Sequence, residues 1–179
     1  MENEFWMRTY GRRGCSIKCG SQQLKDEHGP LRAQMESFFI QAQEVGADNG
    51  VQNWKSAIED LANVVSKFEA ELGPHSDRED NTLFPMMANY IGREVGPIAV
   101  MEYEHEQAKF NLKKFMEAAR GQLPEVLDTK QAKKIAAYAI QAYLILSDHF
   151  AKEENNIFPM AERMLTDDEK RALADAFKA

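Results

Sequence analysis

One segment occurs twice in this sequence, and the repeat limits the fold more than any other feature. Residues 75–86 read HSDREDNTLFPM and residues 149–160 read HFAKEENNIFPM, so His, Glu, Asn, Phe, Pro and Met match in register. In each copy the glutamate follows the histidine by four residues, a spacing that puts both side chains on one face of an α-helix. The repeat therefore predicts two helices that present the same polar face.

The rest of the chain has the pattern of an all-α protein. From about residue 22, apolar residues recur at intervals of three and four, with almost no strand-like alternation. We expect long helices over about residues 22–45, from 51 onward, over 97–119 and over 127–165. Four long helices with short connections favour an up-down-up-down four-helix bundle.

Individual residues indicate where these helices begin and end. Pro97 suits a first helical position, and Gly121 suits the end of the same helix. Thr166 and Glu169 have the spacing of a capping box, which predicts a short additional helix at the C-terminal end. Pro74 falls inside the second helix, where a proline clashes with the carbonyl four residues earlier. We therefore expect a kink or a restarted helix at Pro74.

The first residues differ from the rest in composition. Residues 1–20 are basic, contain three glycines and have no long amphipathic pattern, so we interpret them as an irregular arm before a bundle domain of residues 21–179. Trp6 and Tyr10 make this arm the expected contact for a protein partner or a homodimer. Cys15 and Cys19 are too few for a disulfide framework and fit reduced thiols, with a redox pair as the alternative.

Charge and hydropathy exclude several classes of partner. The chain has 22 basic and 29 acidic residues and a net charge of -7, which disfavours binding to nucleic acid or to an anionic membrane. No apolar run approaches the ~20 residues that a membrane-spanning helix needs, and the N-terminus lacks the apolar region of a secretory signal. These features predict a cytoplasmic protein.

The four histidines of the chain fall one on each predicted long helix. If they lie at one level of the bundle, two metal ions can each have two imidazoles, and a glutamate can bridge them with its two oxygens. Imidazole and carboxylate together suit iron. The expected metal ligands are His28, His75, Glu79, His105, His149 and Glu153.

The charge of such a site also needs compensation. Two carboxylates and an oxo bridge would leave a diferric pair with two positive charges, which further acids around the ligands could offset. The candidates for this outer layer are Glu27, Asp80, Glu104 and Glu154. Four tyrosines could donate hydrogen bonds to a bound oxygen species: Tyr90, Tyr103, Tyr138 and Tyr143.

The motifs resemble the hemerythrin or HHE cation-binding family over roughly residues 22–165. They comprise Glu27-His28-x-x-Leu31-Arg32, His75-x-x-x-Glu79 before Leu83-Phe84-Pro85, Glu104-His105, and His149-x-x-x-Glu153 before Phe158-Pro159. The resemblance implies a four-helix bundle that holds two non-haem iron ions, bridged by carboxylates and by an oxo or hydroxo group.

Two positions separate this sequence from the oxygen-carrying hemerythrins. The carriers have a fifth histidine four residues after the third-helix histidine, where this chain has Lys109. Their last carboxylate is an aspartate five residues after its histidine, whereas Glu153 follows His149 by four. Four histidines with two glutamates are more similar to the diiron proteins named for repair of iron centres. Those proteins also have an N-terminal domain with adjacent cysteines, and here only the arm with Cys15 and Cys19 takes that place.

The resemblance implies a centre that binds or reacts with oxygen, peroxide or nitric oxide, because fewer imidazoles leave more open coordination positions. The function that the resemblance implies is a role in the response to oxidative or nitrosative stress, or in iron metabolism. A reversible oxygen carrier, an iron or oxygen sensor, and a structural zinc or manganese site are the alternatives. A ferritin-like oxidase needs Glu-x-x-His on two helices, and only Glu102-x-x-His105 fits.

Overall fold

The computed structural model of the protein describes residues 20–48 and 50–178. The arm expected at residues 1–20, with Trp6, Tyr10, Cys15 and Cys19, lies outside the described residues except for Gly20. That glycine is already the first residue of a long helix.

Four long helices form the described part of the chain, in the order that the periodicity predicts. Two of them pass through a short π-helical turn into a further helix. The bounds are α1 Gly20–Glu44, α2 Lys55–Arg78, η2 Glu79–Leu83, α3 Phe84–Ile91, α4 Pro97–Arg120, α5 Thr129–Lys152, η3 Glu153–Ile157, α6 Phe158–Met164 and α7 Asp167–Ala176.

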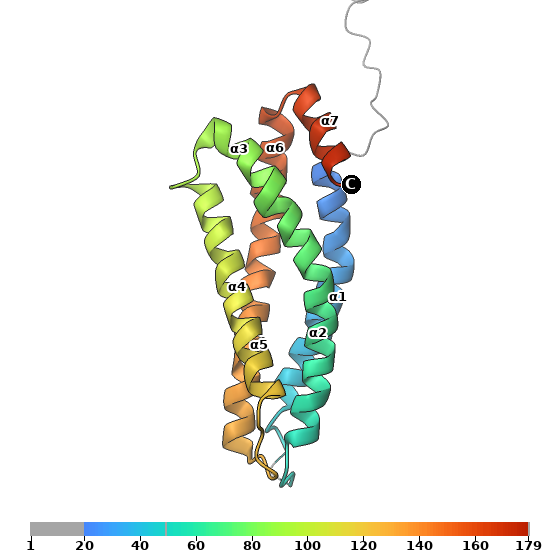
Figure 1. The fold of residues 1–179 in the computed structure, drawn as a ribbon, viewed down its shortest axis with the longest axis vertical. Helices are drawn as coiled ribbons and strands as arrows, with labels where there is room; N and C mark the ends of the chain where they lie inside the picture. Colours follow the sequence, from blue (N-terminus) through green and yellow to red (C-terminus); the bar gives the residue numbers. More distant parts are fainter. Residues whose placement is uncertain (1–19, 49, 179) are drawn as a thin grey trace, which may run out of the picture.

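The long helices pack as an antiparallel bundle. Helix α1 packs against α2 and α5, and helix α4 packs against the same two, so that each long helix has two main neighbours. Consecutive long helices run in opposite directions, and the short helix α7 lies at one end against α1 (Figure 1). The expected all-α, up-down-up-down bundle with an extra C-terminal helix is confirmed.

The sequence signals at several helix ends are also confirmed. Helix α4 begins at Pro97 and is capped by Gly121. The side chain of Thr166 accepts a hydrogen bond from the backbone of Glu169, and both halves of the capping box are present. An unforeseen capping box, between Asp128 and Gln131, starts α5. These caps satisfy backbone N–H groups that have no partner inside a helix.

Of the two outcomes expected at Pro74, a restarted helix was wrong, because α2 continues through this proline to Arg78. The α pattern changes later, at the π turn η2, where the N–H of Phe84 donates to the carbonyl of Glu79. The turn η3 has the equivalent bond from Phe158 to Glu153. A proline follows each of these phenylalanines and cannot donate the hydrogen bond that would continue an α pattern.

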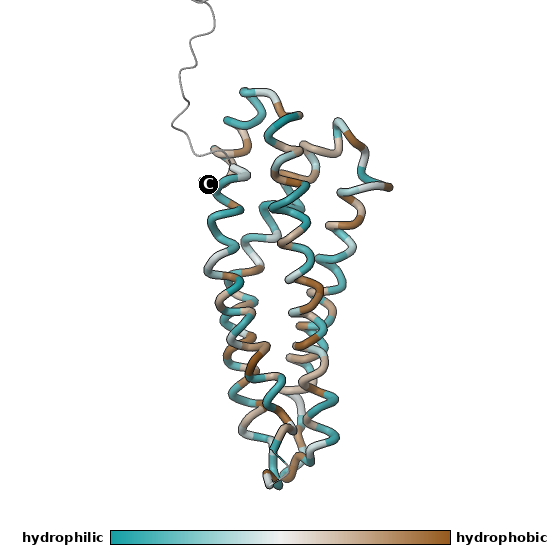
Figure 2. Tube along the Cα trace, turned by 180° about the vertical axis from the view of Figure 1, so that it is seen from behind, coloured by the Kyte–Doolittle hydropathy of each residue, from teal (hydrophilic) through white to brown (hydrophobic). Residues whose placement is uncertain are grey.

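The buried apolar residues form two clusters with a polar layer between them. The larger cluster fills the part of the bundle toward the 45–54 and 121–128 connections, and the smaller one lies among α3, α6 and α7. Leu24 belongs to the smaller cluster and Leu31 to the larger, so His28 lies between the two. Figure 2 shows hydrophobic and hydrophilic positions alternating along the helices, as bundle packing requires. Among the described residues, no helix is long and apolar enough to span a bilayer.

Candidate metal centre

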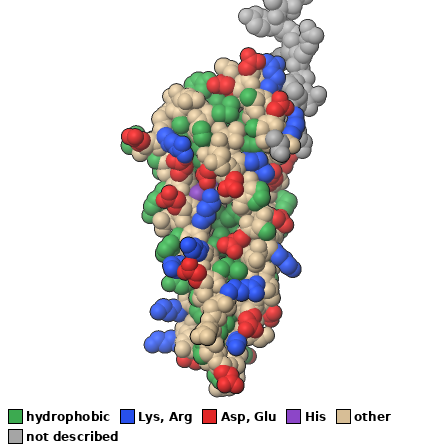
Figure 3. Space-filling model, in the orientation of Figure 1, with side chains coloured by type: hydrophobic (Ala, Val, Ile, Leu, Met, Phe, Trp, Pro, Cys, Tyr) green, Lys and Arg blue, Asp and Glu red, His purple; other side chains and the backbone are tan. Residues whose placement is uncertain are grey.

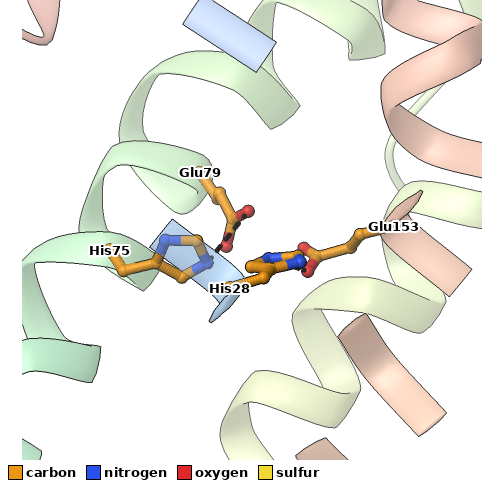
Figure 4. A group of neighbouring side chains, drawn as sticks. All are labelled: His28, His75, Glu79 and Glu153. Carbon is orange, nitrogen blue, oxygen red and sulfur yellow. Dashed lines mark ion pairs between the residues drawn. The ribbon is translucent and has the colours of Figure 1, made fainter. Parts of the chain in front are cut away.

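The structure brings all six expected ligands together in the polar layer. His28 comes from α1, His105 from α4, and His75 and His149 from the last turns of α2 and α5. The two glutamates are the first residues of the π turns. All six side chains are buried. Four of them, from the two long helices α1 and α2 and from both π turns, point toward one another in Figure 4.

The six side chains form two overlapping groups. One comprises His28, His75, Glu79 and Glu153, and the other comprises Glu79, His105, His149 and Glu153. In each group the four potential ligand atoms lie within 4.8 Å of one another. Each group therefore has two imidazoles of its own and shares both carboxylates with the other.

The two oxygens of each glutamate face different histidines. In Glu79, Oε1 lies 3.5 Å from Nε2 of His75, and Oε2 lies 3.5 Å from Nε2 of His105. In Glu153, Oε2 lies 3.3 Å from Nε2 of His28, and Oε1 lies 3.1 Å from Nε2 of His149. Each carboxylate thus spans both groups, as a bridging ligand does.

The inner atoms of this layer have no hydrogen-bond partners. They are Nε2 of His28, His75 and His149, and both carboxylate oxygens of Glu79 and Glu153. Buried polar atoms normally have partners, because an unsatisfied one costs about 1–3 kcal/mol. A cation in each group would be contacted by these same atoms, so the residues present fit two metal ions. The ligand role of the six residues stays a prediction.

An outer layer of carboxylates holds the opposite side of each histidine. The Nδ1 atoms of His28 and His75 lie 2.8 Å from Glu154 and 2.9 Å from Glu27. Equivalent distances at the other pair are 2.7 Å from His105 to Asp80 and 3.2 Å from His149 to Glu104. An Nδ1–H that donates to a carboxylate leaves Nε2 free to bind a metal. These acceptors are the four acids that the sequence predicts for the outer layer.

Each outer carboxylate is in turn paired with a basic residue, and these pairings were not predicted from the sequence. Arg78 donates to Glu27, and Lys152 donates to Glu104. Arg32 lies 2.9 Å from Glu154, and Lys109 lies 3.0 Å from Asp80. A signal was present, because each basic residue follows a site histidine by three or four positions and so shares its helix face.

The buried charges shift the pKa values of the site. Burial favours neutral His149, but the negative charge of Glu153 and the hydrogen bond to Glu104 outweigh it and raise the pKa of His149 to about 10. The pKa values of His75 and His105 are raised in the same way, against burial, by facing carboxylates. Burial and the nearby charge of Glu153 raise the pKa of Glu79. The facing carboxylates therefore favour the protonated form of these three histidines.

The tyrosines considered as hydrogen-bond donors face elsewhere. Tyr90 donates to Glu169, and Tyr143 donates to Glu36. Tyr103 is largely exposed, and Tyr138 packs against the larger apolar cluster. The expectation that these hydroxyls face the site is not supported within the described part of the chain.

Two surface pockets reach the outer layer from different sides. One, of about 270 Å³, is lined by Glu154 and Phe158, and the other, of about 360 Å³, is lined by Glu104 and Tyr103. On the face drawn in Figure 3, histidine is visible only at one small point among acidic and basic side chains. Small molecules can therefore approach the outer carboxylates, while the inner ligands stay buried.

Fold and site together are consistent with a helical-bundle protein that has a buried binuclear metal site. Residues 19–161 match the family model described as Hemerythrin HHE cation binding domain. The chain belongs to this family of cation-binding proteins.

Several curated relatives are described as iron-sulfur cluster repair protein YtfE. The protein from Musicola paradisiaca is 30% identical over 144 residues, which cover 79% of this chain and 62% of the relative. The protein from Pectobacterium carotovorum is 30% identical over 104 residues, 58% of this chain and 47% of the relative. The Escherichia coli K12 protein is 27% identical over 135 residues, which cover 75% of this chain and 60% of the relative. The chain thus spans about half to three fifths of these relatives' length. No solved structure gave a significant match.

Proposed function

We propose that the protein is a non-haem diiron protein whose centre reacts with oxygen, peroxide or nitric oxide in the repair of damaged iron centres. The observation that carries the proposal is the pair of buried groups that share Glu79 and Glu153. Their inner atoms have no hydrogen-bond partners, and their chemistry, imidazole with carboxylate, suits iron. The relatives named for iron–sulfur cluster repair support the part of the proposal that concerns repair.

His28 and His75 would hold one iron, His105 and His149 the other, and the two glutamates would hold both. Iron supplies redox chemistry and sites for small ligands, which no side chain of this layer supplies. The protein fixes the ligands: the outer carboxylates orient the imidazoles, and the basic residues paired with them hold those carboxylates. The apolar clusters on both sides of the layer exclude bulk water.

The number of side-chain ligands favours a centre that reacts with small oxidants over one that only carries oxygen. Six side-chain ligands provide four imidazoles, and Lys109 is paired with Asp80 instead of joining either group. Two metal ions with this set keep open positions, and an open position is what allows a small substrate to react. The pockets at Glu154 and Glu104 are the routes by which such a molecule would approach.

The test uses purified full-length protein loaded anaerobically with ferrous iron. We expect it to consume peroxide or nitric oxide at least about ten times faster than the same concentration of free ferrous iron. The variant with both His75→Ala and His149→Ala should lose this excess rate, whereas Tyr143→Phe, remote from the layer, should keep it. Consumption no faster than by free iron for oxygen, peroxide and nitric oxide alike would refute a reactive centre.

A second assay addresses repair directly. An iron–sulfur enzyme that has been inactivated by peroxide is incubated with the loaded protein and a thiol reductant. We expect recovery of its activity beyond that given by free ferrous iron at equal concentration. Equal recovery with free iron would refute the repair function. It would not bear on the reaction with oxidants, which the first assay tests.

A further inference from the structure

The two metal groups have the same inner ligands but differ in their outer layers. Around His28 and His75 the carboxylates Glu154 and Glu27 are both paired with arginines. We call this group the arginine-linked position. It is completed by Arg32 and Arg78.

Around His105 and His149 the corresponding carboxylates are both paired with lysines. Lys109 lies 3.0 Å from Asp80, and Lys152 donates to Glu104. We call this group the lysine-linked position. The basic residues occupy equivalent places in the two halves of the chain, so the two positions differ by an arginine-to-lysine exchange at both places.

Arginine and lysine restrain a carboxylate differently. Guanidinium is planar, is weakly hydrated and has five donors in a rigid fork, whereas an ammonium is a strongly hydrated point charge on a flexible stem. The side chains of Lys109 and Lys152 are also the more exposed, at 46% and 42%, against 36% and 26% for Arg32 and Arg78. Water therefore competes more strongly for the basic side chains of the lysine-linked position, which hold their carboxylates less firmly.

The aromatic contacts of the two positions also differ, because Phe84 stacks on His105 at a centroid distance of 5.7 Å, which is longer than the equivalent contact at the arginine-linked position. The ring of Phe150 stacks on His28 with centroids 4.1 Å apart and an interplanar angle of 14°. The guanidinium carbon of Arg32 lies 5.4 Å from the centroid of the same Phe150 ring, and Arg78 lies 5.7 Å from that of Phe177. Among the described residues, neither Lys109 nor Lys152 lies over an aromatic ring.

We propose that the two positions bind metal with unequal strength, and that the ion at the lysine-linked position exchanges first. The inference rests on the proposed binuclear function and extends it to an order of metal loss. Residues that orient a metal-bound histidine alter metal affinity about 10- to 100-fold when changed, so a difference of this kind can separate two otherwise identical positions. Arg32, Arg78, Lys109 and Lys152 would act as positioning residues, through the carboxylates.

The experiment follows metal loss from protein loaded with two Co²⁺ ions, chosen because the visible spectrum of Co²⁺ reports its coordination. Excess chelator is mixed with the protein, and absorbance is recorded over time. We expect two phases of equal amplitude with rates about tenfold or more apart, as outer-layer effects on affinity imply. A single phase that releases both ions together would overturn the inference.

Charge-conserving exchanges then assign the phases. The double variant Lys109→Arg with Lys152→Arg should slow the fast phase, and Arg32→Lys with Arg78→Lys should accelerate the slow one. Circular dichroism and thermal unfolding check that each variant folds as the parent does. Two phases that neither exchange alters, or that change in the opposite direction, would also overturn the inference.

Crystals of the protein depleted to half its cobalt identify the remaining position by anomalous scattering. The expected peak lies between His28 and His75, and a peak between His105 and His149 would contradict the inference. Failure of the inference would leave the proposed function standing, because a protein that binds two ions equally strongly can still react with oxidants. If fewer than two ions bind from the start, the binuclear proposal itself fails.

Discussion

The ammonium of Lys109 lies 3.0 Å from Oδ2 of Asp80, while Oδ1 of the same carboxylate lies 2.7 Å from Nδ1 of His105. Lys109 stands where the oxygen-carrying hemerythrins have their fifth histidine, and here it is paired with an outer carboxylate. Lysine here supports the orientation of His105 and leaves the inner layer with four imidazoles.

The substitution Lys109→His tests this role. A histidine at this position is expected to add an imidazole and fill an open coordination position, so peroxide consumption should fall about tenfold or more while two metal ions remain bound. Lys109→Gln is the matched control, because it removes the charge without adding a ligand. Unchanged peroxide consumption by Lys109→His would show that this position does not control access to the metal.

Glu153 and Glu154 are neighbours with opposite orientations, and they give a matched pair of variants. Glu153 faces both metal groups, so Glu153→Gln should reduce the metal content from two ions to one or none. Glu154 is hydrogen-bonded to Nδ1 of His28 and to Arg32 on the outside of the layer, so Glu154→Gln should keep two ions at saturating metal and lose about 10- to 100-fold in affinity. Metal titration of both variants measures this difference, and equal behaviour would contradict the inner and outer assignment.

Metal binding should stabilise the fold, because the inner atoms of the polar layer have no hydrogen-bond partners without it. Free metal at a thousand times the dissociation constant stabilises the native state by about 4 kcal/mol for one site. Urea unfolding with Zn²⁺, which has no redox chemistry, against unfolding with a chelator measures the shift. The same midpoint in both solutions would contradict binding at the buried layer.

Metal loading should release protons. The pKa of His149 is raised to about 10, so this imidazole is protonated at pH 7 and must lose a proton to bind a metal, and the pKa values of His75 and His105 are raised in the same direction. Apparent affinity should therefore rise with pH from 7 toward 10. An indicator dye in weakly buffered solution measures the release at pH 7. Loading without any release would show that the imidazoles are not the ligands.

Much of the fold and site followed from local patterns in the sequence. Helix periodicity predicted the four long helices, Gly121 predicted the end of α4, and Thr166 predicted the start of α7, because caps depend on nearby residues. The repeat predicted which faces meet, since histidine and glutamate at a spacing of four must share a helix face. The one histidine on each remaining helix then completed the polar layer.

Other features depend on tertiary contacts and were missed. Pro74 was expected to kink or restart the second helix, but α2 is continuous through it, and the change of helix pattern falls at the π turns instead. The turns could have been suspected from the Phe-Pro pairs that follow Glu79 and Glu153, since π turns are frequent at functional sites. The spacing of Arg32 from His28 puts both on one helix face, but the partner of Arg32, Glu154, is far away in sequence and no local pattern identifies it.

The central claim is that six named side chains hold two iron ions, and iron analysis of reconstituted protein tests it most directly. The account predicts two irons per chain in the parent protein. It predicts one or none in His28→Ala and in His149→Ala, which each remove a ligand from a different group. Fewer than two irons in the folded parent protein, or two irons retained by either variant, would contradict the claim.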